Sequence, residues 1–268
     1  MKYPGQPTGA MHGHRARKRF GQNFLVDRAY IDRIVRAIDP HSDDRMVEIG
    51  PGLGALTAPL LERLSVLHVI EIDRDIVARL AADFSPERLI VHQGDALKFD
   101  LAALGPGLRV VGNLPYNISS PLLFHTAECA AALCDCHFML QREVVDRMAA
   151  APGSKVYGRL SVMLQYRFEV EKLFNVPAGA FRPTPQVDSA FVRLVPHATL
   201  RSPATDERLL AQMVAKAFTQ RRKTVRNALS EFASAEELAA HGIDPRLRPE
   251  DLSLDDFVRL ANAVAART

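Results

Sequence analysis

Residues 47–54, VEIGPGLG, decide the fold class, because they join an apolar run to a glycine-rich turn and then to a helical pattern. Gly50, Gly52 and Gly54 allow the backbone to turn tightly and to approach a ligand that side chains would keep away. The spacing is G-x-G-x-G, whereas enzymes that bind a dinucleotide pyrophosphate carry G-x-G-x-x-G. The turn therefore predicts a ligand-binding sheet edge, with NAD as the less favoured ligand and a plain tight turn as the structural alternative.

On both sides of this turn, short apolar runs alternate with helical patterns. The expected strands are 46–49, 66–72, 89–92, 109–111, 137–140, 161–168 and 190–195, and the expected helices are 55–64, 75–84 and 119–133. Alternation of strand and helix is the signature of a parallel sheet with helices on both faces. The sequence therefore predicts an α/β, Rossmann-like domain over residues 18–198.

The last 70 or so residues follow a different pattern. Apolar residues recur there at helical spacing, as in Leu210, Met213, Val214 and Ala217, and Ser253 with Asp256 forms a capping-box pattern. No strand pattern remains. We expect a small all-helical domain over residues 199–268 and a disordered basic segment over residues 1–17.

Two acidic residues follow strands of the expected sheet. Glu71 comes about 20 residues after the first glycine, at the end of the second strand, where a carboxylate can accept hydrogen bonds from both ribose hydroxyls. Asp95 follows the third strand. Ligands of open α/β sheets bind at the carboxyl ends of the strands, so these residues predict a nucleoside site. S-adenosylmethionine fits, since it carries adenine, ribose and a charged amino acid but no phosphate.

A polar turn, Asn113-Leu114-Pro115-Tyr116, follows the fourth strand at the same edge. The Asn113 amide oxygen and the Leu114 carbonyl can both accept hydrogen bonds from an exocyclic NH2 group. Pro115 stiffens the turn, and Tyr116 offers a face on which a flipped base can stack. In isolation the tetrapeptide reads as an ordinary proline turn. Beside a cofactor site it predicts methyl transfer to adenine N6, driven mainly by proximity and orientation.

Several motifs together resemble the KsgA family of ribosomal RNA adenine N6,N6-dimethyltransferases. The resemblance runs from Lys18 to about Arg226. It is carried by residues 19–25 (RFGQNFL), the 48–54 loop, 94–96 (GDA), 113–116 (NLPY), 141–144 (QREV) and 181–189 (FRPTPQVDS). The resemblance implies a class I S-adenosylmethionine-dependent methyltransferase with a helical C-terminal domain.

The same resemblance implies the site residues. Asn23 and Leu25 are expected to contact the cofactor together with Gly50, Gly52, Glu71, Asp95 and Asn113. Asn113, Leu114 and Tyr116 are expected at the reacting adenine, with Phe181 as a second aromatic wall. The implied substrate is a hairpin of 16S rRNA in the small ribosomal subunit or its precursor, in which two neighbouring adenosines are each methylated twice.

Basic residues gather in two runs without acids, although the net charge is only +3. The residues expected to bind RNA phosphates are Arg17, Lys18, Arg19, Arg221, Arg222, Lys223 and Arg226. Helical spacing would put Arg222 and Arg226 on one face of a helix. A solvated surface is the alternative reading of such runs.

The remaining features narrow the class of protein. Apolar residues make up 47% of the 268-residue chain, which is ordinary globular composition. We expect no secretory signal, membrane span or metal, and a cytoplasmic monomer with reduced thiols at Cys129, Cys134 and Cys136.

Three other functions compete with this reading. A macrolide-resistance type methyltransferase acting on large-subunit rRNA would share both sites, but the longer helical domain argues against it. A non-catalytic RNA-binding assembly factor would keep the fold, but intact Asn113 and Glu71 argue against loss of chemistry. A DNA adenine methyltransferase is disfavoured because Leu114 matches the RNA-acting branch.

Overall fold

The computed structural model describes residues 23–220 and 222–267, which form two compact units. The sheet unit comprises the described residues up to Val145 together with Glu171–Pro196, and the helical unit comprises Asp146–Val170 together with the described residues from His197 onward. The expected segment 1–17, Arg17, Lys18, Arg19 and Arg221 lie outside the described residues.

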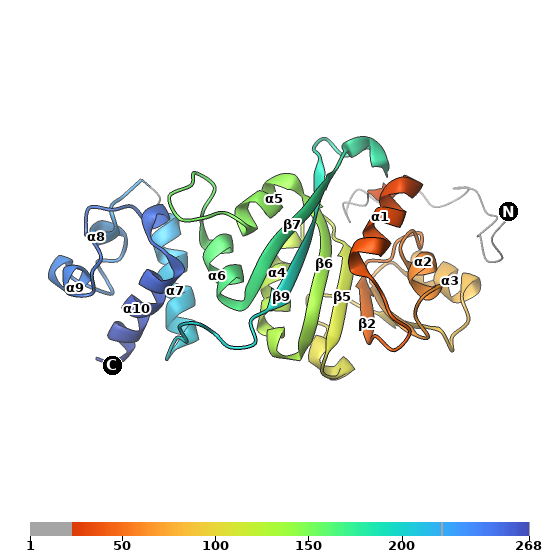
Figure 1. Ribbon diagram of the computed structural model, residues 1–268, viewed down its shortest axis with the longest axis horizontal. Helices are drawn as coiled ribbons and strands as arrows, with labels where there is room; N and C mark the ends of the chain where they lie inside the picture. Colours follow the sequence, from red (N-terminus) through yellow and green to blue (C-terminus); the bar gives the residue numbers. More distant parts are fainter. Residues whose placement is uncertain (1–22, 221, 268) are drawn as a thin grey trace. The chain divides into compact units, whose positions relative to one another are not determined.

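A seven-stranded sheet in the order β4-β3-β2-β5-β6-β9-β7 forms the framework of the sheet unit (Figure 1). The strands are β2 (Met46–Ile49), β3 (Leu67–Glu71), β4 (Leu89–Gln93), β5 (Leu108–Asn113), β6 (Leu133–Gln141), β7 (Phe168–Val176) and β9 (Ser189–Pro196). Neighbouring strands from β4 to β6 are parallel, whereas β9 is antiparallel to β6. The glycine turn after β2 and the polar turn after β5 therefore share one sheet edge.

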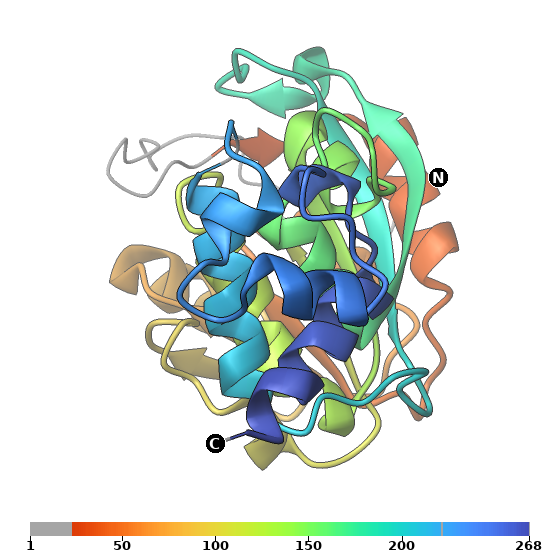
Figure 2. The same ribbon diagram turned by 90° about the vertical axis from the view of Figure 1, so that its left-hand side faces the viewer.

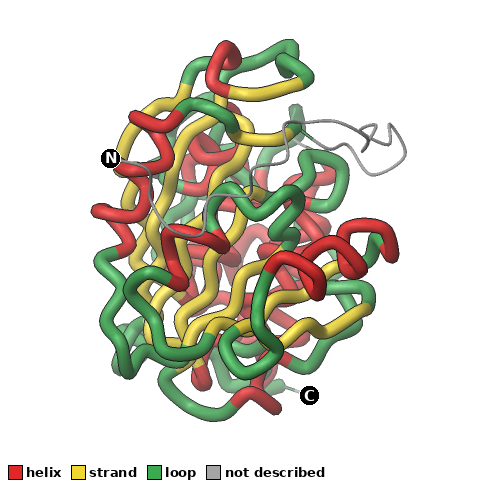
Figure 3. The backbone as a smooth tube through the Cα atoms, turned by 90° about the vertical axis from the view of Figure 1, so that its right-hand side faces the viewer, coloured by secondary structure: helices red, strands yellow, loops and turns green. Residues whose placement is uncertain are grey.

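Helices α1 (Arg28–Ile38), α2 (Thr57–Leu61) and α3 (Arg74–Asp83) gather beside β2 in Figure 1. Their buried apolar residues join those of the sheet in one hydrophobic cluster. The other helices of this unit are α4 (Ser119–Glu128), α5 (Arg142–Met148), which continues into the helical unit, and the 3-10 turns Leu101–Leu104, Ala130–Ala132 and Ala178–Ala180. In Figure 3 the strands run side by side in yellow, with helices flanking them in red.

Two short strands, β1 (Phe24–Leu25) and β8 (Phe181–Arg182), pair antiparallel outside the main sheet. The pairing continues beyond β1, because the amides of Val26 and Asp27 both donate to the carbonyl of Ala180. Asp27 then caps α1 by accepting a hydrogen bond from the amide of Ala29. Backbone hydrogen bonds and strand pairing therefore hold residues 24–27 in place directly before α1 begins.

The helical unit has its own hydrophobic core. It contains α6 (Arg159–Arg167), α7 (Glu207–Thr219), α8 (Val225–Ala228), α9 (Ala235–Ala240), the 3-10 turn Pro249–Asp251 and α10 (Leu254–Ala265). Figure 2 shows α7 and α10 alongside each other in blue, and their buried residues share one cluster. The capping box of Ser253 and Asp256 is confirmed at the start of α10. No helix among the described residues is long and apolar enough to cross a membrane.

The structure differs from the sequence predictions in several respects. Residues 161–168, expected as a strand, form most of helix α6, because Val162 and Tyr166 pack into the core of the helical unit and Ser161 caps the helix through the amide of Gly158. That packing also places residues 146–170 in the helical unit instead of the domain predicted over 18–198. The sheet is mixed, since β9 is antiparallel. Arg222 and Lys223 precede α8 and do not share a helix with Arg226.

Candidate functional site

The glycine turn after β2 leaves backbone open to a ligand. Gly50, Gly52 and Gly54 have φ values of 68°, 54° and 82°, which side-chain-bearing residues rarely adopt. A Cβ atom added at Gly50 would meet no protein atom within 4 Å, whereas one at Gly52 would lie 3.0 Å from Cε1 of Phe24. The turn therefore presents bare backbone on one side and packs against β1 on the other.

Two buried carboxylates stand beside this turn. Glu71, at the end of β3, accepts hydrogen bonds from the amides of Ile72 and Asp73, both at 2.8 Å. Glu48, in β2, accepts a hydrogen bond of 2.6 Å from the hydroxyl of Thr57. Glu48 is 2% exposed and Glu71 is 6% exposed, so both charges lie largely out of water. A ligand with positive charge or hydroxyl donors would stabilise their ionised forms.

Burial shifts the titration of both groups upward. It raises the pKa of Glu48 to about 7, against the opposing effect of the Thr57 hydrogen bond and with a further upward contribution from the charge of Glu71. Burial also raises the pKa of Glu71, although the amides of Asp73 and Ile72 oppose the shift. Ionisable groups with shifted pKa values are common at functional sites, because catalysis and binding require pKa values matched to the task.

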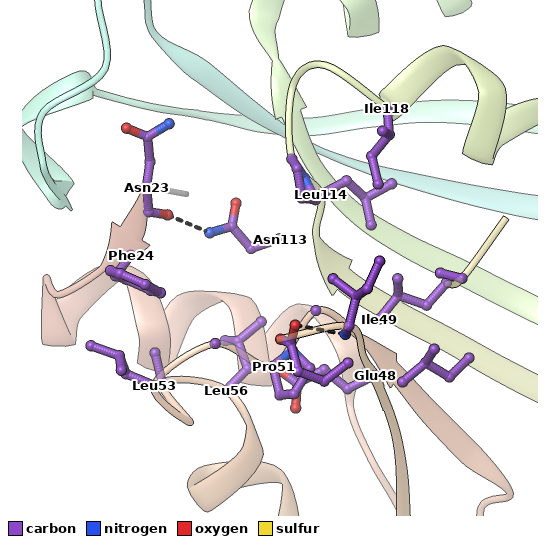
Figure 4. A pocket seen from close by; sticks show the side chains of 18 of the residues that line it. Asn23, Phe24, Glu48, Ile49, Pro51, Leu53, Leu56, Asn113, Leu114 and Ile118 are labelled. Atoms are coloured by element: carbon purple, nitrogen blue, oxygen red, sulfur yellow. Dashed lines mark hydrogen bonds between the residues drawn. The ribbon is translucent and has the colours of Figure 1, made fainter. Parts of the chain in front are cut away.

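The pocket between these turns is lined by residues from β1 and from the ends of β2, β3, β4 and β5 (Figure 4). All of the residues predicted for the cofactor line it, namely Asn23, Leu25, Gly50, Gly52, Glu71, Asp95 and Asn113. The carboxylate of Asp95 accepts a hydrogen bond of 3.0 Å from the amide of Leu97, which holds its side chain in a turn at the pocket wall. The residues come from five separate parts of the chain, and the sheet edge brings them together.

Asn113 is held in one orientation by Asn23, the residue before β1. Its Nδ2 atom donates to the backbone carbonyl of Asn23 at 2.9 Å, and Figure 4 shows the amide turned toward that carbonyl. Since the NH2 side of the amide is engaged, its Oδ1 atom is the group left to accept a hydrogen bond from a ligand. The contact spans 90 residues of sequence, and no local pattern predicts it.

The rest of the polar turn is also fixed at the pocket. The amide of Leu114 donates to the carbonyl of Met139 in β6 at 3.1 Å, and the Ser119 hydroxyl donates to the carbonyl of Pro115 at 3.0 Å. Leu114 and Tyr116 both line the pocket. The Tyr116 hydroxyl lies 2.8 Å from the hydroxyl of Ser189 in β9.

Phe181, predicted as a second aromatic wall for the adenine, lies in the core of the sheet unit. Its side chain is fully buried in the hydrophobic cluster of the sheet unit, and it is not among the pocket-lining residues. Phe181 pairs with Leu25 between β8 and β1, so it supports the strand that carries one predicted cofactor contact, Leu25, and is preceded by another, Asn23. Its role as a second aromatic wall for the adenine stays a prediction.

Sequence reasoning missed several pocket residues. Phe24 and Ile72 were assigned no role, and Glu48 entered only as part of the glycine loop. An acidic residue inside an otherwise apolar strand was the available signal for Glu48, because an unpaired buried carboxylate is costly. Nothing in the sequence indicated that Ile72 lines the pocket, because the 49% exposure of this apolar residue is a property of the folded chain.

The cysteines form no metal site. Among residues 23–220 and 222–267, no group of three or more histidine, cysteine, aspartate or glutamate side chains could hold a metal ion. Cys129, Cys134 and Cys136 are all free thiols, and Cys136 is buried. Burial raises the pKa of Cys136 well above its ordinary value, so this thiol is a poor ligand and a poor nucleophile.

Comparison with known proteins agrees with this geometry. The family described as Ribosomal RNA adenine dimethylase matches residues 13–266. The chain is 60% identical over 258 residues to Ribosomal RNA small subunit methyltransferase A of Aromatoleum aromaticum, covering 96% of this chain and 97% of the relative. It is 60% identical over 254 residues to the protein of the same name from Laribacter hongkongensis, covering 94% and 97%.

Solved structures give the same picture. A dimethyladenosine transferase from Plasmodium falciparum matches with a TM-score of 0.77 and 26% identity, covering 91% of this chain and 98% of that one. The 23S rRNA methyltransferase ErmE matches with a TM-score of 0.71 and 25% identity, covering 91% and 100%. The predicted α/β methyltransferase fold is confirmed.

Proposed function

The chain belongs to the ribosomal RNA adenine dimethylase family, and from this premise we propose how its pocket works. The protein is an S-adenosylmethionine-dependent rRNA adenine N6,N6-dimethyltransferase. It transfers methyl groups to N6 of two adjacent adenosines in a hairpin of 16S rRNA during small-subunit biogenesis. The bound cofactor supplies a sulfonium methyl group, and the roles below are those of the chain's own residues.

The pocket fits S-adenosylmethionine. The open space beside Gly50 admits a ligand against bare backbone, and the buried carboxylate of Glu71 suits a ribose with two hydroxyl donors. We assign Asp95 to the adenine end and Asn23, Leu25 and Gly52 to the walls. Glu48, with its raised pKa, lies where a positively charged ligand would favour the carboxylate.

The fixed orientation of Asn113 carries the proposed mechanism. Its Oδ1 atom and the Leu114 carbonyl accept hydrogen bonds from the N6 amino group and draw that nitrogen away from conjugation with the ring. The Tyr116 ring stacks on the flipped base and excludes water. Because the NH2 group of Asn113 is already held by Asn23, the acceptor is preorganised before substrate binds.

The small subunit is the favoured substrate over the large one. Relatives at 60% identity are small-subunit methyltransferases, whereas the 23S enzyme is 25% identical. We propose that the protein acts in the cytoplasm as a monomer on 16S rRNA within the small subunit or its precursor. The alternative of a non-catalytic assembly factor is disfavoured, and a methyl-transfer assay distinguishes it from an enzyme.

Arg222, Lys223 and Arg226 are proposed to bind RNA phosphates. All three are exposed in the helical unit, and the segment from Arg222 to Ser230 contains no acid. Arg17, Lys18, Arg19 and Arg221 are proposed for the same role from the sequence alone, since they lie outside the described residues.

Methylation of small subunits that lack the modification tests the proposal. Purified protein, labelled S-adenosylmethionine and these subunits should yield N6,N6-dimethyladenosine, detected by nucleoside mass spectrometry. Large subunits and an Asn113→Ala variant serve as controls. Label in 23S rRNA instead would favour the macrolide-resistance reading, and tight binding without label in either RNA would favour the assembly factor.

A further inference from the structure

The hydroxyl of Tyr116 is hydrogen-bonded to Ser189, a residue to which the proposed mechanism assigns no role. Tyr116 lines the pocket, and its Oη atom lies 2.8 Å from Oγ of Ser189. Ser189 is fully buried and does not line the pocket. A buried serine hydroxyl therefore contacts the far end of the ring on which the target base is proposed to stack.

Ser189 belongs to the main sheet through its backbone. It is the first residue of β9 and pairs with Gln141 of β6, which in turn pairs with β5 up to Asn113. The hydroxyl thus connects the turn after β5 to a strand two places away in the same sheet. Burial raises the pKa of the Tyr116 phenol, which keeps the hydroxyl protonated at neutral pH.

The other contacts of the turn fix different atoms. Leu114 is held through its amide, Pro115 through its carbonyl, and Asn113 through its side-chain amide. None of these hydrogen bonds reaches the Tyr116 ring. Within the described residues, the hydrogen bond to Ser189 is the one that the Tyr116 side chain makes.

We propose that Ser189 is a positioning residue for methyl transfer, whose hydroxyl holds the Tyr116 ring in the orientation on which the target adenine stacks. Without this bond the ring can turn about its side-chain torsions while the backbone of the turn stays in place. The stacked base would then sample poses in which N6 is not aligned for transfer, and small misplacements of reacting atoms are costly. The inference rests on the proposed function, because it assumes that Tyr116 stacks on the base.

A double-mutant cycle with single-turnover methylation of small subunits tests this role. Ser189→Ala and Tyr116→Phe should each lower the single-turnover rate constant about five- to tenfold, the loss expected for one neutral hydrogen bond acting on alignment. The double variant should be no slower than either single variant, because both changes break the same bond. The affinity of Ser189→Ala for S-adenosylmethionine, measured by calorimetry, should stay unchanged, since Ser189 does not line the pocket.

Thr126→Val is the matched control, because the Thr126 hydroxyl is also fully buried but bonds the carbonyl of Leu122 within α4. It should leave the rate constant unchanged. Tyr116→Phe carries the test alone if Ser189→Ala does not fold. Additive losses, wild-type rates in both single variants, or a loss of cofactor affinity in Ser189→Ala would each overturn the assignment. Wild-type protein inactive on every subunit would instead refute the proposed function.

Discussion

Asn113 shows how one side chain can be assigned chemistry from its contacts. Its amide donates to Asn23 and so presents an acceptor to the pocket. Asn113→Ala should therefore lower turnover by about two orders of magnitude, as deletion of a preorganised polar group does elsewhere. Single-turnover methylation measures the effect, with calorimetry of cofactor binding as the control. A variant that loses only cofactor affinity, with a normal transfer rate, would make Asn113 a binding residue.

Glu48 links cofactor binding to pH and to stability. Its pKa is raised from 4.5 to about 7, so the folded protein holds this proton more tightly than the unfolded chain does. Its contribution to stability is therefore present below pH 4.5 and is lost as pH rises to about 7. In the absence of ligand, Glu48→Gln should stabilise the protein at pH 8 by about 1–3 kcal/mol, because no buried charge remains.

The same substitution should weaken binding of the positively charged cofactor. Wild-type affinity should rise with pH through about 7 as Glu48 ionises, and this rise should flatten in Glu48→Gln. Denaturant unfolding at pH 6 and pH 8, with calorimetry at the same two values, measures both effects. If the affinity of Glu48→Gln depended on pH as strongly as that of wild type, another group would be responsible for the titration, and Glu71 is the nearest candidate.

Strands and helices were predictable where periodicity and burial agree. β2 was predicted with its observed bounds, and the ligand-binding ends of β3 and β5 were placed to within about two residues. The strand predicted over residues 161–168 is wrong because every second residue of α6 is apolar, a pattern typical of a strand. Packing within the helical unit stabilises a helix there instead. β1 and β8 are two residues each and carry no period. Their pairing joins Phe181 to Leu25, and Asn23, the partner of Asn113, directly precedes β1.

Arg109 shows what a strand requires beyond its apolar pattern. In β5 this largely buried guanidinium bonds both carboxylate oxygens of Asp135, at 2.9 and 3.0 Å, and the carbonyl of Ile38 at 2.6 Å. Asp44 adds an ion pair. Arg109→Ala would leave the carboxylate of Asp135, which is 3% exposed, with only the longer ion pair of 3.8 Å to Arg193 among the described residues. The free energy of unfolding should fall by about 3–5 kcal/mol.

Denaturant unfolding of Arg109→Ala measures this decrease, and Arg79→Ala is the control. Arg79 makes an i,i+4 ion pair with Asp83 on the partly exposed face of α3, so its removal should cost about 0.5 kcal/mol or less. Equal effects of the two substitutions would mean that the network around Arg109 adds little beyond a surface pair.

The two units divide the proposed work, with the cofactor pocket in the sheet unit and the described basic cluster in the helical unit. Chemistry and phosphate binding should therefore be separable by mutation. Replacing Arg222, Lys223 and Arg226 with Gln should leave S-adenosylmethionine affinity unchanged and weaken binding of small subunits. The slope of log affinity against log salt should shrink by about 0.7–0.9 for each phosphate that the variant no longer neutralises, because fewer counterions are released.

A salt titration of wild type and the triple variant measures that slope. The charge-matched control replaces Arg63, Arg201 and Arg208, which are exposed in other parts of the chain. The control should keep the wild-type slope, because an electrostatic interaction acts on the phosphates nearby and is screened beyond roughly 10 Å. If the plots of log affinity against log salt had the same slope and intercept for wild type and the basic-cluster variant, the cluster would be a solvated surface without a role in RNA binding. An equally shallow slope in the control would mean that net charge, and not this cluster, attracts the RNA.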